Sequence, residues 1–171
     1  MEYRVAMKIS ETIHYDASPD TVFAMLTDEG FQERKCLDAG AVSHDTTITT
    51  EGSGARIVTH RELPTHDLPD FAKSIVGSKL AVTETYAWGP AAADTSRVGD
   101  LTVQVSGAPV VMRAKVALVP NGGGTRMQID GDLKASIPLL GGKVEKASAP
   151  AVVDAIHSEG RTGRGWLAEH A

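Results

Sequence analysis

The chain has little cysteine, no long apolar run and no excess of basic residues, and each absence excludes a class of protein. The lone Cys36 excludes an internal disulfide framework and a cysteine-rich zinc or iron–sulfur site. No stretch approaches the roughly 18 apolar residues that a membrane-spanning helix needs, so integral membrane association is not expected. Lys and Arg number 17 against 22 Asp and Glu, which argues against a nucleic-acid partner.

Sequence motifs of common enzymes and metal sites are also missing. Neither GxSxG nor a P-loop occurs, and the glycines at 122–124 lack the strand-to-helix setting of a phosphate cradle. There is no HExxH motif, and the six histidines include no short-spacing pair: His14, His44, His60, His66, His157 and His170. We therefore predict no metal and no cofactor. The first residues alternate in polarity instead of forming the apolar block of a signal peptide, so the expected location is the cytoplasm.

Alternating polar and apolar residues fill most of the chain. They predict strands over 3–13, 42–50, 54–63, 79–88, 98–106, 109–119 and 124–135. Glycine-rich links at 52–54 and 121–124 are typical of hairpins, so neighbouring strands should run antiparallel. Strand parity assigns apolar side chains to one face and mixed charges to the other, which predicts a curved sheet with one solvated side.

Helix signals precede and follow this run of strands. Ser18 and Pro19 form a cap and a first helical position, and a second short helix is predicted over 31–37. A long helix should begin near Gly141 or Gly142, with Pro150 kinking or breaking it near Ala149 and glycines in 160–165 loosening its end. The segment 64–77 is interpreted as a loop or short helix over a pocket mouth. The predicted fold class is α+β, in one domain spanning 1–171.

The order of strand, two short helices, six-strand meander and long terminal helix resembles the helix-grip fold of START-like, or SRPBCC, proteins, the superfamily that includes Bet v 1-like proteins. Within it, the chain is most similar to the uncharacterised bacterial family DUF2505. The segments that carry this likeness are 80–84 ahead of Trp88 (Leu-Ala-Val-Thr-Glu) and 137–145 (Ile-Pro-Leu-Leu-Gly-Gly-Lys-Val-Glu). The resemblance implies a cavity between the sheet and the final helix, with lipids, sterols, polyketides or other apolar molecules as the usual ligands.

Candidate ligand-binding residues are those of the inward sheet face and of a stripe of mostly small residues on the final helix. They are Val82, Glu84, Tyr86, Trp88, Val103, Met112, Ala114, Val116, Met127, Ile129, Val144, Ala147 and Ala151. Glu84 is the one catalytic candidate. A buried carboxyl there would have a raised pKa and could donate a proton or anchor a ligand, whereas pairing with an arginine at the strand end is the alternative. Tyr86 and Trp88 could contact a ligand or simply fill the core.

Three further residues have surroundings that suggest a role. His60 and Arg61 are adjacent on a strand, so one of them should point inward as a polar anchor while the other faces solvent. Cys36 lies beside Leu37 on a short helix and is interpreted as a small packed side chain, because the sequence offers it no catalytic partner.

Three functional hypotheses follow. The favoured one is a non-catalytic protein that binds or transports a hydrophobic small molecule or lipid. The second is an enzyme resembling polyketide cyclases and dehydratases, with Glu84 as acid–base. The third is an interaction module with a closed cavity, acting through its surface or as a homodimer.

Overall fold

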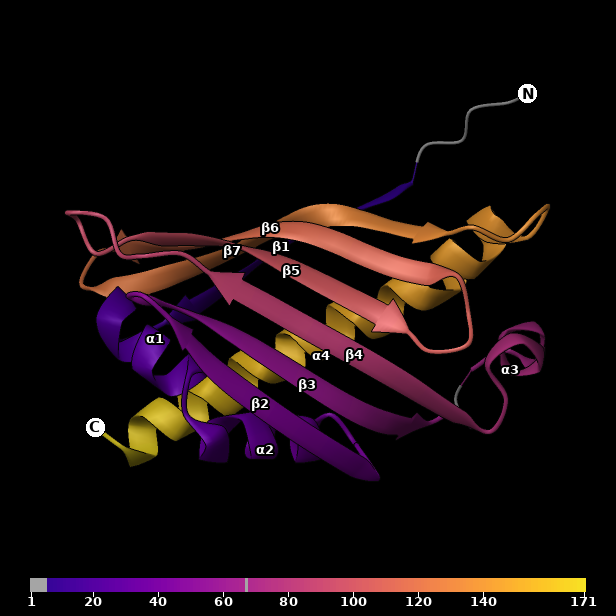
Figure 1. Cartoon of the computed structure of the whole chain (residues 1–171), viewed down its shortest axis with the longest axis horizontal. Helices are drawn as coiled ribbons and strands as arrows, with labels where there is room; N and C mark the ends of the chain where they lie inside the picture. Colours follow the sequence, from indigo (N-terminus) through magenta and orange to yellow (C-terminus); the bar gives the residue numbers. More distant parts are fainter. Residues whose placement is uncertain (1–5, 67) are drawn as a thin grey trace.

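The computed structural model describes residues 6–66 and 68–171. Within this part of the chain, one antiparallel sheet has seven strands in the order β1-β7-β6-β5-β4-β3-β2 (Figure 1). The strands are β1 (Met7–Tyr15), β2 (Ser43–Glu51), β3 (Gly54–Pro64), β4 (Lys79–Trp88), β5 (Arg97–Val105), β6 (Val110–Asn121) and β7 (Gly124–Ala135). The helices are α1 (Pro19–Leu26), α2 (Glu29–Asp38), α3 (Asp70–Val76) and α4 (Gly141–Glu169).

The predicted meander is confirmed, and so is the antiparallel pairing of its strands. From β2 to β7 each strand pairs with its successor, and tight links such as Gly52 and Gly122, both at positive φ, connect the hairpins. The first strand, β1, forms the edge of the sheet beyond β7 and pairs with β7. Met7 is opposite Leu133 and Tyr15 is opposite Thr125. This strand ends two residues later than expected, at Tyr15, while Tyr3 and Val5 of the predicted strand lie outside the described residues.

Local capping explains the two short helices that follow β1. The Ser18 hydroxyl accepts a hydrogen bond from the backbone N–H of Thr21 at 3.2 Å, and Pro19 occupies the first turn. The Asp28 carboxylate caps α2 in the same way, by accepting from the N–H of Phe31 at 3.2 Å. Both helices therefore begin where the sequence provides an acceptor side chain.

The long helix α4 crosses the inner face of the sheet and packs against β1, β7 and α2 (Figure 1). Of the predicted kink or break near Ala149, the break was wrong, because α4 continues through Pro150 to Glu169 without interruption; the kink stays a prediction. A single proline removes one intrahelical hydrogen bond, and packing along a 29-residue helix can compensate for that loss. Pro150 itself is exposed.

The glycines near the end of α4 also behave differently from the prediction. They do not loosen the helix; Gly160 and Gly163 are buried where α4 approaches β1. A methyl group on Gly160 would lie 3.0 Å from Cγ2 of Ile13, and one on Gly163 would lie 2.5 Å from Cε1 of Tyr15. Absence of a side chain at these two positions allows the helix to approach the sheet closely.

The hydrophobic core lies between the inner face of the sheet and the helices. Fully buried side chains include Leu118, Met127 and Ile129, which share the inward parity predicted for their strands. The outer face instead carries polar cross-strand pairs such as Lys8 with Asp132. One part of this core is filled by side chains, and another part contains a cavity. The cavity is the candidate site.

Candidate binding cavity

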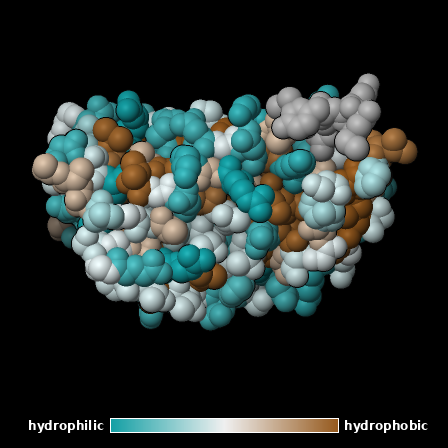
Figure 2. Space-filling view, turned by 45° about the horizontal axis from the view of Figure 1, so that its top comes forward, coloured by the Kyte–Doolittle hydropathy of each residue, from teal (hydrophilic) through white to brown (hydrophobic). Residues whose placement is uncertain are grey.

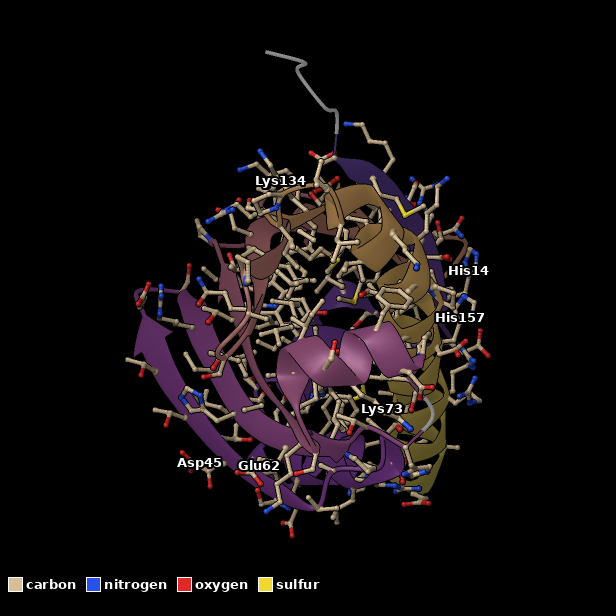
Figure 3. All side chains as sticks on the ribbon, turned by 90° about the vertical axis from the view of Figure 1, so that its right-hand side faces the viewer. His14, Asp45, Glu62, Lys73, Lys134 and His157 are labelled. Carbon is tan, nitrogen blue, oxygen red and sulfur yellow. The ribbon has the colours of Figure 1, made fainter. Side chains whose placement is uncertain are left out.

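A cavity of about 160 Å³ lies between the inner face of the sheet and the part of α4 that runs from Val144 to Glu159. Strands β3 to β7 line one side, with side chains such as Val82, Leu101 and Val105, and α4 lines the other. Near the end of this space lies α3, which carries Lys73 (Figure 3) and adds Ala72 and Ile75 to the wall.

The cavity reaches the surface of the molecule. Ala151 belongs to its wall and is nevertheless exposed, and other wall residues of α4 are half-buried. Brown, hydrophobic surface gathers at the right-hand end in Figure 2, the end that carries α3 and the start of α4 in Figure 1. The segment 64–77 was interpreted as a loop or short helix over a pocket mouth, and the structure places α3 within it, at this end of the cavity.

Many of the predicted ligand-binding residues line this cavity. They are Val82, Glu84, Tyr86, Val103, Met112, Val144, Ala147 and Ala151. The others share the inward face but lie in the filled part of the core: Trp88, Ala114, Val116, Met127 and Ile129. There, α1 packs against β6 and β7, and Trp88 stacks on Tyr86 with ring centroids 5.9 Å apart. Parity identified the correct face of the sheet but not how far the cavity extends along it.

A cluster of buried ionisable side chains forms one part of the cavity wall. We call Lys35, Arg61, Glu84 and Glu159, together with Tyr86, the charged cluster. Each of its members is at least nine-tenths buried. They come from four elements, α2, β3, β4 and α4, so only the folded chain brings them together.

Lys35 is the centre of the charged cluster. Its ammonium forms ion pairs with Glu84 and, at 2.9 Å, with Oε1 of Glu159. On the other side of Glu84, Nη2 of Arg61 lies 3.4 Å from Oε2. The Tyr86 hydroxyl donates to Oε2 of Glu159 at 3.1 Å. Two cations and two carboxylates thus compensate one another inside the protein.

These contacts determine the protonation of the cluster. Burial alone would raise the pKa of Glu84, but the charges of Lys35 and Arg61 outweigh it and hold the pKa below its ordinary value of 4.5. Burial alone would lower the pKa of Lys35, but Glu159 and Glu84 hold it above 10.5. Burial, and then the same carboxylates, raise the pKa of Tyr86 well above 10. Near neutral pH Glu84 is therefore ionised, Lys35 is protonated and Tyr86 is a neutral donor.

The expectation for Glu84 was half right. Its side chain is buried on the inward face as predicted, and the alternative, pairing with an arginine, holds as well. The expected raised pKa was wrong, because two cations face the carboxylate. Of the adjacent pair on β3, Arg61 points inward, whereas His60 is exposed and its Nδ1 lies 2.9 Å from the Thr83 hydroxyl.

Cys36 occupies a buried position beside the charged cluster. Burial raises the pKa of its thiol, which the nearby Arg61 and Lys35 only partly offset. A thiol with a raised pKa is a poor nucleophile, in agreement with the packed role that the sequence suggested.

Sequence reasoning missed Lys35 and Glu159. Helix periodicity carried a signal for both, because Lys35 follows the buried Phe31 by four positions and Glu159 follows the buried Ile156 by three. A charged residue on the apolar face of a helix is a candidate for burial, provided that the fold supplies a counter-charge.

Two other kinds of feature are absent from the described residues, 6–66 and 68–171. No group of three or more His, Cys, Asp or Glu side chains in this part of the chain lies suitably placed to hold a metal ion. None of its helices combines the length and apolar character needed to cross a membrane.

The sheet, the two short helices and the long terminal helix over the inner face define the START-like, or SRPBCC, helix-grip fold. A START superfamily protein from Mycobacterium smegmatis superposes with a TM-score of 0.55 and 15% identity, covering 96% of this chain and 99% of that one. The Zhui aromatase/cyclase from Streptomyces sp. R1128 gives a TM-score of 0.57 and 15% identity, covering 92% and 94%. At these identities the likeness shows the fold alone.

The chain belongs to the family DUF2505, described as a protein of unknown function, whose model matches residues 10–167. The uncharacterized protein Rv0481c of Mycobacterium tuberculosis (strain H37Rv) is 26% identical over 117 residues, or 65% of this chain. The chain spans 64% of the length of the curated relatives that it matches.

Proposed function

We propose that this protein binds a mainly apolar small molecule in the cavity between its sheet and α4. The observation that carries the proposal is a hollow of about 160 Å³ in a fold whose other half is packed. Protein interiors are normally close-packed, and the loss of contacts around a void destabilises the fold. A largely apolar cavity that is open to the surface, and that the fold keeps in spite of this cost, is therefore the first candidate for a ligand-binding site.

The neighbours in fold support the same class of ligand. One is named a START superfamily protein and the other an aromatase/cyclase. The volume is below the roughly 300–1,000 Å³ typical of pockets for drug-sized ligands. The ligand is then either compact or long enough to extend past α3 toward solvent.

Binding can be tested with the neutral fluorescent probe N-phenyl-naphthylamine. We expect a saturable rise in its fluorescence with the native protein, because the apolar wall excludes water from the dye. Val103→Trp should abolish the rise, since Val103 lines the cavity and an indole would fill it. The matched control is Val98→Trp on the same strand, where the side chain is 69% exposed. Equal binding by native protein and both variants would contradict the proposal.

The enzyme hypothesis, with Glu84 as acid–base, receives less support. A general acid must be protonated in the resting site, whereas Lys35 and Arg61 keep Glu84 ionised; by lowering its pKa they also make it a weak general base. The hypothesis of an interaction module with a closed cavity is also less favoured, because Ala151 lines the cavity and is at the same time exposed at the protein surface. A homodimer is a separate hypothesis, which size-exclusion chromatography with light scattering would test.

A further inference from the structure

The charged cluster is neutral as a set, and this limits the head group that a bound molecule can bring to it. Lys35 and Arg61 compensate Glu84 and Glu159 through the ion pairs described above. A ligand carrying a carboxylate or an ammonium group would leave one buried charge without a partner, which is strongly unfavourable. A neutral head group leaves the balance unchanged.

The charged cluster also contains more N–H and O–H donors than its carboxylate acceptors bind. A protonated lysine has three N–H groups and an arginine has five. Among the described residues, Lys35 contacts two carboxylates. The Arg61 guanidinium has the Cys36 thiol as one hydrogen-bond partner, but its Nε has none and its Nη2 contact with Glu84 is long, at 3.4 Å. The Tyr86 hydroxyl already donates to Glu159. An additional acceptor would therefore satisfy donors of this wall. An additional donor would find one carboxylate oxygen without a hydrogen bond, Oε1 of Glu159, which already faces the Lys35 ammonium at 2.9 Å.

Most of the remaining wall offers only apolar contact. Side chains such as Leu63, Leu101, Val103 and Met112 surround the hollow away from the cluster. A ligand that fits both parts has an apolar body and a single polar end. The cavity volume of about 160 Å³ accommodates a body of roughly one medium-sized ring or a short chain.

We propose that the ligand is a neutral molecule with an apolar body and one acceptor oxygen, a ketone or alcohol, which accepts a hydrogen bond from Arg61. This inference rests on the proposed function and specifies its ligand class. Lys35 and Glu84 are positioning residues in this arrangement, because they hold the guanidinium in place and keep the site neutral.

A set of ring compounds of similar size tests the head group directly. Cyclooctanone, cyclooctane, cyclooctanecarboxylate and cyclooctylamine would each compete with N-phenyl-naphthylamine for the native protein at neutral pH. We expect cyclooctanone to bind about tenfold more tightly than cyclooctane, the gain from one hydrogen bond in a buried site. The carboxylate and the ammonium compound should bind more weakly than the ketone.

Substitution of Arg61 tests the donor. In Arg61→Met the preference for cyclooctanone over cyclooctane should disappear, while cyclooctane binding persists. If this variant does not fold, Arg61→Met combined with Glu84→Gln retains the Lys35–Glu159 pair and the charge balance, and the same loss is expected. The control Arg113→Met, on the exposed face of β6, should keep the preference.

The outcomes separate the two proposals. Equal binding of all four compounds, or tightest binding of the carboxylate or the amine, would overturn the head-group inference and leave the proposed function standing. A ketone preference that survives in the Arg61 variants would also overturn it. Failure of the probe and of every ring compound to bind the native protein would overturn both.

Discussion

Replacement of Lys35 by methionine is the most direct test of how the charged cluster is held together. Lys35 is 3% exposed and forms ion pairs with both Glu84 and Glu159. Methionine has a similar shape without the charge, so packing is largely kept. Glu84 would retain Arg61 at 3.4 Å, but among the described residues Glu159 would keep as its direct partner only the hydroxyl of Tyr86. One carboxylate would then be buried without a counter-charge.

Breaking a buried ion pair by removing one partner costs about 3–5 kcal/mol. For a chain of 171 residues, a loss of that size lowers Tm by about 6–20 °C. Urea unfolding followed by circular dichroism at neutral pH would measure the change in the free energy of unfolding. Lys115→Met is the matched control, because Lys115 is exposed and pairs with Asp100 on the surface. It should cost no more than about 1 kcal/mol.

A second variant distinguishes lost charge compensation from lost packing. Lys35→Met combined with Glu159→Gln removes the unpaired carboxylate, so it should recover a large part of the lost stability. A free energy of unfolding for Lys35→Met within about 1 kcal/mol of the native protein would refute the reasoning. So would a double variant less stable than the single one.

Three other predictions concern stability. Gly163→Ala should cost about 1–3 kcal/mol in urea unfolding, because its methyl group would lie 2.5 Å from Tyr15, whereas Gly142→Ala, with open space around it, should be neutral or stabilising. Pro150→Ala should stabilise by about 2 kcal/mol, since the interior-proline penalty exceeds the entropy that proline removes from the unfolded chain; an unchanged Tm would contradict this. Thermal unfolding should show stability falling as the pH drops below about 4.5, because the folded-state pKa of Glu84 is lowered and the unfolded chain takes up the proton first. In Glu84→Gln this acid dependence should weaken, and an unchanged pH profile would count against the ion pairs.

Much of the fold was predictable because its signals are local. Alternation of polar and apolar residues at every second position predicted strands over 79–88 and 124–135. The structure has β4 and β7 at those positions. Ser18 and Pro19 predicted the start of α1 for an equally local reason. The alternative of a break at Pro150 was wrong, because the local cost of a proline does not include the packing along α4 that offsets it.

The candidate site was only partly predictable. Inward parity identified Val82, Glu84 and Tyr86, which line the cavity, but it also selected Met127 and Ile129, which lie in the filled core. The two kinds of position look alike in sequence. Which of them faces a hollow depends on where α1 packs against the sheet.

The sequence by itself determined the strands, their inward faces, the helix caps and the burial of Glu84. Alternation and capping act between near neighbours, so they can be read along the chain. Tertiary structure alone decided the extent of the cavity and the partners of Glu84. Lys35 is 49 positions from Glu84, and Glu159 is 73 positions from Tyr86. The charge balance that now limits the ligand exists only where the folded sheet and helices bring these side chains together.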